Sequence, residues 1–289
     1  MNKTVDLTIN SRGEHMKFGI GWREEVLTEI SEQINNIDVI EILADQYMFD
    51  LRKKVEILKK ALPKKEIIFH CVNLSIGSSE LDLDYLHELK RLVDIFDPTI
   101  VSDHIGITRY KYYDTGIACP VSYNSKTLKT FEANIKKFQK IIGKPLILEN
   151  ISSPLKPLKE EFSEAEFIAK LYQASGVNIL LDVTNLYINS KNYNFDCREW
   201  LDKVPISSVR QLHLAGGNEV DGKLWDSHCC AVAENNWHIY KMVVNLFSNI
   251  EFVVVERDRR YDNFYESIND VFKAKDILLK YKYFAQGND

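Results

Sequence analysis

The sequence has few cysteines, no long apolar run and no excess of positive charge. Its five cysteines include no CxxC spacing, which argues against a disulfide framework and against a zinc ribbon. No apolar run approaches the roughly 20 residues that span a bilayer, and the polar N-terminus is unlike a signal peptide. A net charge of −5 argues against a general nucleic-acid binder. The sequence therefore predicts a soluble, cytoplasmic protein with neither membrane nor nucleic acid as a partner.

The composition is that of a folded chain with a large core. Of the 289 residues, 45% are hydrophobic, and the prolines and glycines are scattered rather than gathered into a linker. We therefore expect one domain over residues 16–289, preceded by a flexible extension over residues 1–15. The adjacent Cys229 and Cys230 are expected to be free thiols, because unpaired cysteine usually behaves as a small hydrophobic residue.

Short apolar runs rich in β-branched residues alternate along the chain with longer amphipathic segments. Eight runs are expected to form strands: Lys17–Gly21, Asp38–Leu43, Glu66–His70, Thr99–His104, Pro145–Asn150, Asn178–Val183, Val209–Leu214 and Glu251–Glu256. Apolar residues at helical spacing mark these segments as helices: Met48–Leu62, Leu83–Phe96, Ser125–Ile142, Glu160–Ala174, Trp237–Phe247 and Phe264–Leu279. Eight strand–helix units in about 250 residues are typical of a (β/α)8 TIM barrel. The sequence therefore predicts an α/β fold of this class.

Most of these strands are expected to end in a side chain that can bind a metal ion. These residues are Glu41, His70, Asp103 with His104, Glu149, Asp182, His213 and Glu256. A further pair, Asp226 and His228, is expected in a turn after the seventh strand. A TIM barrel gathers the carboxyl ends of its strands at one face, where its active sites lie. These side chains are therefore expected to meet at the mouth of the barrel.

Each of these residues has an ordinary explanation as a helix cap or as a hydrogen-bonded core histidine. As a set, they would bring several carboxylates together, and these repel one another unless cations neutralise them. A polynuclear metal centre resolves this conflict. Mixed imidazole and carboxylate ligation suits Fe, Zn or Mn, and the absence of thiolates from the set disfavours copper and iron–sulfur sites.

Seven short motifs together resemble a known family in their order along the chain. They are His70–Ser78, Ser102–His104, Leu148–Ile151, Leu181–Tyr187, His213–Gly216, Asp226–His228 and Glu256–Asp258. This ordered set resembles the multinuclear non-haem iron-dependent oxidative enzymes (MNIO), formerly domain of unknown function 692. The resemblance covers roughly residues 17–279 and implies a xylose-isomerase-like TIM barrel.

The resemblance also implies a cluster of two or three iron ions in a mixed Fe(II)/Fe(III) state. The ligands it implies form three sets: His70, His104 and Glu149; Glu149 as a bridge with Asp182, His213 and Glu256; and Asn185, Asp226 and His228.

At three positions this chain differs from the endonuclease IV relatives or from the usual pattern of the family it resembles. The trinuclear zinc centre of the endonuclease IV relatives on this fold has a histidine where this chain has Asn185. A neutral amide binds metal more weakly than imidazole, so the third site is expected to be labile or partly filled. Cys71 replaces a usual glycine, and Gly217 stands where histidine or tyrosine is common, but neither is an implied ligand.

The family implies oxidation of a residue, in most cases cysteine, in a ribosomally made precursor peptide with dioxygen. Asp258, two residues after Glu256, is expected to orient a ligand or accept a proton, with an ion pair to Arg257, Arg259 or Arg260 as the alternative. The family also implies a separately encoded partner that binds the peptide leader. The loop tyrosines Tyr110, Tyr112 and Tyr113 are expected either to line a peptide groove or to pack within the loop.

Other functions remain compatible with the same barrel. One is a zinc-dependent phosphodiester hydrolase like endonuclease IV, which the net charge and Asn185 disfavour. A second is a sugar isomerase, which the lack of its lysine-bearing motif disfavours. A third is a metal-binding scaffold without catalytic activity. Metal identity and dioxygen consumption separate these alternatives from the oxidative enzyme.

Overall fold

Parallel strands and helices alternate along the chain and close into a barrel. The computed structural model describes residues 16–49, 52–62, 64–110, 113–155 and 160–286, so the expected extension over residues 1–15 lies outside the described residues. Going around the barrel, the strands follow the order β1, β12, β9, β8, β7, β4, β3 and β2, which pairs again with β1. The barrel strands are β1 (Lys17–Gly21), β2 (Val39–Leu43), β3 (Glu66–His70), β4 (Val101–His104), β7 (Leu146–Glu149), β8 (Asn178–Asp182), β9 (Val209–Leu214) and β12 (Phe252–Val255).

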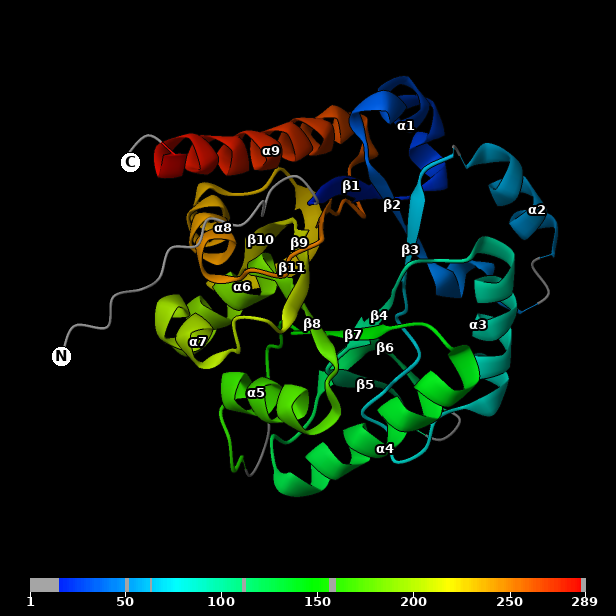
Figure 1. Ribbon diagram of the computed structural model, residues 1–289, viewed down its shortest axis with the longest axis vertical. Coiled ribbons are helices and arrows are strands. Elements are labelled where there is room, and N and C mark those ends of the chain that lie inside the picture. Colours follow the sequence, from blue (N-terminus) through cyan, green and yellow to red (C-terminus); the bar gives the residue numbers. More distant parts are fainter. Residues whose placement is uncertain (1–15, 50–51, 63, 111–112, 156–159, 287–289) are drawn as a thin grey trace.

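Helices surround the strands on the outside of the barrel (Figure 1). The α-helices are α1 (Leu27–Gln33), α2 (Arg52–Ala61), α3 (Leu83–Phe96), α4 (Ser125–Ile142), α5 (Glu164–Ser175), α6 (Val183–Tyr193), α7 (Cys197–Lys203), α8 (Glu234–Leu246) and α9 (Phe264–Gln286). Short 3-10 helices are η1 (Glu24–Val26), η2 (Ile34–Asn36), η3 (Ala44–Tyr47) and η4 (Tyr261–Asn263). None of the helices in the described part of the chain is long and apolar enough to cross a membrane.

The predicted (β/α)8 TIM barrel is confirmed, and each expected strand coincides with a barrel strand. Three strands have the expected bounds, and the others are one or two residues shorter. The helices were placed less closely. The predicted bounds equal those of α3 and α4, but the apolar periodicity did not identify α1, α6 and α7 as separate helices.

Along five of the barrel strands the inward-facing side chains change from apolar to acidic or histidine. A buried apolar cluster fills the lower part of the barrel, and it consists of Val39, Ile68, Ile100, Ile147, Leu180, Phe252 and Val254. Because alternate residues of a strand point to the same face, the residue two positions later points inward as well. That residue is acidic or histidine after Val39, Ile68, Ile147, Leu180 and Val254. The strands therefore place metal-binding side chains directly above an apolar floor.

Two β-hairpins extend the face of the barrel where the strands end. The first, β5 (Gly106–Tyr110) with β6 (Tyr113–Pro120), follows β4, and the second, β10 (Gly216–Val220) with β11 (Lys223–Cys230), follows β9. The sequence did not predict either hairpin. Asp226 and His228 therefore lie on a strand, and the expectation of a turn was wrong. His228 has φ of 46° and lies between Trp225 and Cys230, where the register between β11 and β10 shifts.

Candidate metal centre

Strand register brings the candidate ligands together in neighbouring pairs. His104 at the end of β4 lies beside Glu149 at the end of β7. Asp182 at the end of β8 lies beside His213 on β9. Glu256 follows β12 directly, and its amide donates to the carbonyl of Leu214 at 2.9 Å. The barrel thus gathers side chains from distant parts of the sequence at one mouth.

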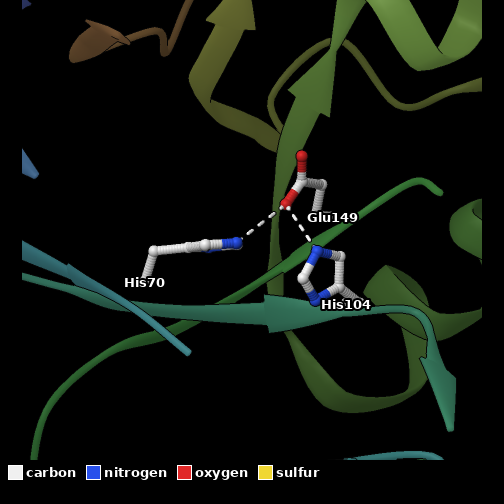
Figure 2. Close-up of side chains that lie close together, drawn as sticks. All are labelled: His70, His104 and Glu149. Carbon is white, nitrogen blue, oxygen red and sulfur yellow. Dashed lines mark ion pairs between the residues drawn. The ribbon is translucent and has the colours of Figure 1, made fainter. Parts of the chain in front are cut away.

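The first group consists of His70, His104 and Glu149. The Nε2 atoms of His70 and His104 each lie 3.5 Å from Oε2 of Glu149, so that both rings converge on one carboxylate oxygen (Figure 2). One ligand atom from each residue lies within 4.8 Å of the others. This spacing can enclose a single metal ion, and the group has the same members as the first set that the family resemblance implied.

The second group shares Glu149 and adds Asp182, His213 and Glu256, all of them buried. Its ligand atoms also lie within 4.8 Å of one another. Nδ1 of His213 is 3.2 Å from Oε1 of Glu149 and 3.0 Å from Oε2 of Glu256. The two oxygens of Glu149 therefore face different groups, which is the geometry that a bridging carboxylate requires.

The third predicted set, Asn185, Asp226 and His228, lines one cavity together with His70, His104, Glu149 and Glu256. Nε2 of His228 is 2.7 Å from Oδ1 of Asp226, while Nδ1 of His228 is 2.7 Å from Oδ2 of Asp258. The side-chain amide nitrogen of Asn185 donates to the carbonyl of Asn150 at 3.1 Å. The amide oxygen of Asn185 is thereby left as its free ligand atom.

Several ligand atoms in this centre are buried and have no partner outside the candidate ligands among the described residues. Oδ2 of Asp182 and Oδ1 of Asn185 have no hydrogen-bond partner at all. The others approach only another candidate ligand: Oε2 of Glu149, Oε2 of Glu256, Oδ1 of Asp226 and Nε2 of His228. Buried polar atoms in folded proteins are nearly always satisfied, and a cluster of exceptions indicates an ion or another missing partner. Oxygen and imidazole donors with no thiolate suit Fe, Zn or Mn. The residues present therefore fit a metal cluster.

The pKa values in this cluster reflect the burial of several carboxylates. Burial, reinforced by Asp226 and Glu149, raises the pKa of Asp182 well above its usual value. Burial acts to lower the pKa of His213, but Glu256 and the neighbouring carboxylates outweigh it and hold that pKa well above normal. His104 has no such excess of acidic neighbours, and burial lowers its pKa to about 4. Metal binding must therefore displace protons from this cluster.

A sequence model described as "RiPP precursor modification enzyme MbnB/TglH/ChrH" matches residues 17–279 of this chain. RiPP denotes a ribosomally synthesised and post-translationally modified peptide. The match spans the whole barrel and all three ligand sets. The chain belongs to this family. The resemblance to the MNIO enzymes, formerly domain of unknown function 692, is thereby confirmed.

Relatives of this MNIO chain share its length as well as its sequence. A protein named UPF0276 from Caulobacter vibrioides is 31% identical over 243 residues, which cover 83% of this chain and 86% of that protein. A UPF0276 protein from Acaryochloris marina is 28% identical over 265 residues, with 91% and 95% of the two chains covered.

Solved structures with low identity share the fold of the MNIO barrel. A xylose isomerase domain containing protein from Salmonella typhimurium has a TM-score of 0.62 at 12% identity, over 92% of this chain and 98% of that one. Endonuclease IV from Thermus thermophilus has a TM-score of 0.55 at 14% identity, with 90% and 98% covered. The predicted xylose-isomerase-like architecture is therefore confirmed.

Residues around the candidate ligands hold the histidines in place. His70 Nδ1 is 2.7 Å from the Ser102 hydroxyl, which leaves Nε2 of the ring to face Glu149. Nε2 of His213 is 3.0 Å from Oε2 of Glu41. Partners of this kind fix the orientation of a ligating imidazole and raise its basicity. The sequence placed Glu41 among the strand ends but did not assign it this supporting position.

Two strand-end residues of the MNIO barrel lie elsewhere than expected. Glu41 is followed by two more residues of β2 and lies deeper in the barrel, beside His213. Asp103 points away from the mouth, because it alternates with the inward-facing His104. Its Oδ2 accepts a hydrogen bond from the amide of Ile76 at 3.0 Å. Asp103 thus supports the segment after β3 and is not grouped with the ligands.

Asp258 contacts a candidate ligand, as the sequence suggested, but its cationic partner is different. Its Oδ1 accepts from Nε of the buried Arg23 at 2.8 Å, and Oδ2 lies beside His228. Arg257 instead pairs with Glu266, 2.9 Å away. Arg23 lies 235 positions away in sequence, so no local pattern could reveal the pair.

A cavity of about 410 Å³ opens above the ligands. His70, His104, Glu149 and Asn185 line it, together with Asp226, His228, Glu256 and Asp258. The exposed Ile117 of β6 and Trp225 of β11 contribute apolar surface to its walls.

Of the tyrosines that were expected to line a peptide groove or to pack within the loop, Tyr113 is 74% exposed on β6, and Tyr112 lies outside the described residues. All five cysteines are free, as predicted.

Proposed function

We propose that this protein is an iron- and dioxygen-dependent oxidative enzyme that modifies a residue, in the first instance a cysteine, of a ribosomally synthesised precursor peptide. Membership of the precursor modification family supports the class of substrate. The observation that carries the proposal is the pair of adjoining donor groups that share Glu149. Two groups with a common carboxylate suit a cluster of ions rather than a single one.

The ligand chemistry favours iron over softer metals. His70, His104 and Glu149 offer one mixed imidazole and carboxylate set, and Asp182, His213 and Glu256 extend it. A mixed-valent iron cluster in these sets would supply the electrons and the open coordination positions that oxidation by dioxygen needs. Asn185, Asp226 and His228 would hold a third ion more weakly, because an amide oxygen is a poorer ligand than imidazole.

The chain's own residues would position the peptide and manage protons. Asp258 lies 2.7 Å from Nδ1 of His228 at the cavity wall, and the buried Arg23 holds its other oxygen. Asp258 can therefore orient His228 and accept a proton at Oδ2. The buried apolar residues beneath the ligands exclude water from below, so that a peptide residue would enter only from the mouth.

Exposed apolar side chains on the two hairpins offer a surface that a peptide and a partner protein can contact. Ile117 and Trp225 line the cavity from the two hairpins and are 63% and 42% exposed. Tyr113, on the same hairpin as Ile117, is 74% exposed. Exposed apolar groups gathered near one site are typical of interaction surfaces. We propose that this rim contacts the precursor peptide and a separately encoded partner that binds its leader.

The test is a reaction with a cysteine-bearing precursor peptide, which would be sought among the genes that neighbour the gene for this protein. Iron-loaded protein, together with a partner protein found in the same search, would be supplied with that peptide and dioxygen, and mass spectrometry would follow the product. We expect dioxygen consumption and a mass change that disappear when the cysteine of the peptide is replaced by alanine. Iron-loaded protein that leaves the peptide unchanged and consumes no dioxygen would instead indicate a metal-binding scaffold.

A further inference from the structure

A second cavity, of about 300 Å³, lies beside the metal centre. Its lining residues come from the first turn of α5, from α6 and α7, and from the segment that follows β7. Figure 1 shows these three helices on one side of the barrel. Aromatic side chains supply much of its lining: Tyr123, Tyr193, Phe195 and Trp200. A volume of this size accommodates one large side chain together with part of its backbone. We call it the α5–α7 cavity.

One carboxylate of the lining, Glu164, is hydrogen-bonded to two of these aromatic side chains. Its Oε1 accepts from the Tyr123 hydroxyl at 3.2 Å, and its Oε2 accepts from the Trp200 indole nitrogen at 3.0 Å. Each carboxylate oxygen has two acceptor positions, so both can accept another hydrogen bond from a molecule in the cavity. Burial raises the pKa of Glu164 to about 7. Among the described residues, no lysine or arginine forms an ion pair with Glu164 that would lower this pKa.

The remaining ionisable groups make the cavity acidic. Glu160, Asp196 and Glu199 line it, and the one cation among its described lining residues is Lys203. Nζ of Lys203 lies 3.5 Å from Glu166, outside the cavity. A positively charged group that enters would meet an excess of negative charge together with aromatic side chains, and both favour cations.

Position links the α5–α7 cavity to the site of the proposed reaction. Ile151 lines both this cavity and the cavity above the metal ligands. Asn189 of α6 fixes the intervening segment by donating to the carbonyl of Ile151 at 2.8 Å and accepting from the amide of Ser153 at 3.2 Å. The exposed Leu155 continues this segment along the cavity edge. A peptide with one residue at the metals can therefore place a nearby side chain in the second cavity.

We propose that the α5–α7 cavity binds a cationic side chain, arginine or lysine, of the precursor peptide. This proposal rests on the proposed function for the identity of the peptide but not for the chemistry of the cavity. Glu164 receives the charged group through its free acceptor positions, and Tyr123 and Trp200 hold the carboxylate in place. The cavity is thus a specificity site beside the reaction centre.

Binding of single blocked residues to the full-length protein tests the cavity separately from the oxidation. The probes are N-acetyl-arginine methylamide, its lysine counterpart, and the citrulline compound, which is a neutral isostere of arginine. The indole N–H resonance of Trp200, assigned with a Trp200→Phe variant, reports on the cavity by NMR. We expect one of the cationic probes to shift this resonance and to bind at least about tenfold more tightly than citrulline.

Variants and a pH series distinguish binding of the cationic probe at Glu164 from nonspecific electrostatic attraction to the protein surface. Glu164→Gln should reduce binding of the cationic probe about tenfold, whereas Glu56→Gln, on the exposed surface of α2, should not change it. In the wild-type protein, binding of the arginine probe should weaken as the pH falls below about 7, because Glu164 then takes up a proton. Glu160, Asp196, Glu199, Lys203, Tyr123 and Tyr193 also face the cavity, and none of them is a histidine.

The proposal is overturned if citrulline binds as tightly as both cations, or if none of the probes moves the Trp200 resonance. The pH series in the wild-type protein keeps the test decisive if Glu164→Gln does not fold. Oxidation of the peptide is not measured in this experiment. A failure of the cavity proposal therefore leaves the proposed function intact, and failure of the oxidation assay leaves the cavity result intact.

Discussion

The two carboxylate oxygens of Asp182 are available for different purposes: one caps a helix, and the other can bind a metal ion. Its Oδ1 accepts a hydrogen bond from the amide of Asn185 at 2.7 Å and so caps the N-terminus of α6. Its Oδ2 is buried and lacks a hydrogen-bond partner in the described part of the chain. At the level of sequence, helix capping and metal ligation were alternative explanations for such a carboxylate. The geometry makes them compatible.

Substitutions of Asp182 separate these two properties. Asn caps helices as well as Asp, so Asp182→Asn should keep α6 capped but weaken metal binding by removing a charge. Asp182→Ala should lose the cap as well, and its metal-free form should be about 1 kcal/mol less stable than that of Asp182→Asn. Elemental analysis and urea unfolding measure the two effects. Undiminished metal content in Asp182→Asn would contradict the assignment.

Ser102 is predicted to act on the metal only through His70. Removal of the hydroxyl in Ser102→Ala frees Nδ1 of the ring, and partners of this kind typically change metal affinity by about 10- to 100-fold. Competition with a chelator measures the affinity. Ser208→Ala is a matched control, since Ser208 is also buried but donates to the carbonyl of Pro205. Equal losses in both variants would show that the effect is not specific to His70.

At the scale of elements, strand periodicity was the most reliable signal in the sequence. The strands of a barrel are short apolar runs, and their last inward positions can be read from the alternation of side chains. His70, Glu149 and Asp182 were located in this way. The second hairpin was missed because Gly216–Val220 and Lys223–Cys230 show little apolar alternation, and none of their residues belongs to the buried hydrophobic core.

The members of the ligand groups could be predicted more completely than the contacts that hold the ligands in place. The division into two groups that share Glu149 came from the family resemblance, and the structure brings the same residues together. The pairing of Asp258 with Arg23 and of His213 with Glu41 depends on how distant segments pack. No spacing rule in a single sequence encodes such contacts.

The hairpin of β10 and β11 is predicted to control only the third metal position. A double Asp226→Ala and His228→Ala variant should lower the metal content without abolishing it, because the two groups around Glu149 come from barrel strands. A control variant with Glu219→Ala and Lys223→Ala alters the exposed end of the same hairpin and should retain all of its metal. Complete loss of metal from the Asp226 and His228 variant would contradict the independence of the sites.

At the scale of the whole molecule, the mouth of the barrel concentrates acidic groups over an apolar floor. This arrangement costs stability when no cation is present, because buried carboxylates repel one another or must take up protons. A bound ion that contacts only the folded state stabilises it, by about 2.7 kcal/mol at a free concentration of 100 times Kd. The folded barrel and its metals should therefore support each other.

Thermal unfolding should reveal this coupling. Addition of Fe(II) without oxygen should raise Tm by several degrees, and Glu149→Ala should abolish the rise. The pKa of Asp182 is raised in the folded protein, so protons compete with metal, and the rise in Tm should shrink as the pH is lowered. A rise in Tm that is the same at all pH values would contradict this account of the cluster.

The identity and number of the metals test the central claim most directly. The protein would be purified without oxygen from iron-supplemented cells and examined by elemental analysis together with Mössbauer spectroscopy. The account predicts two or more magnetically coupled iron ions per chain and their loss in His70→Ala and Glu149→Ala variants. Stoichiometric zinc without iron under the same conditions would contradict it and would favour a hydrolase on this barrel.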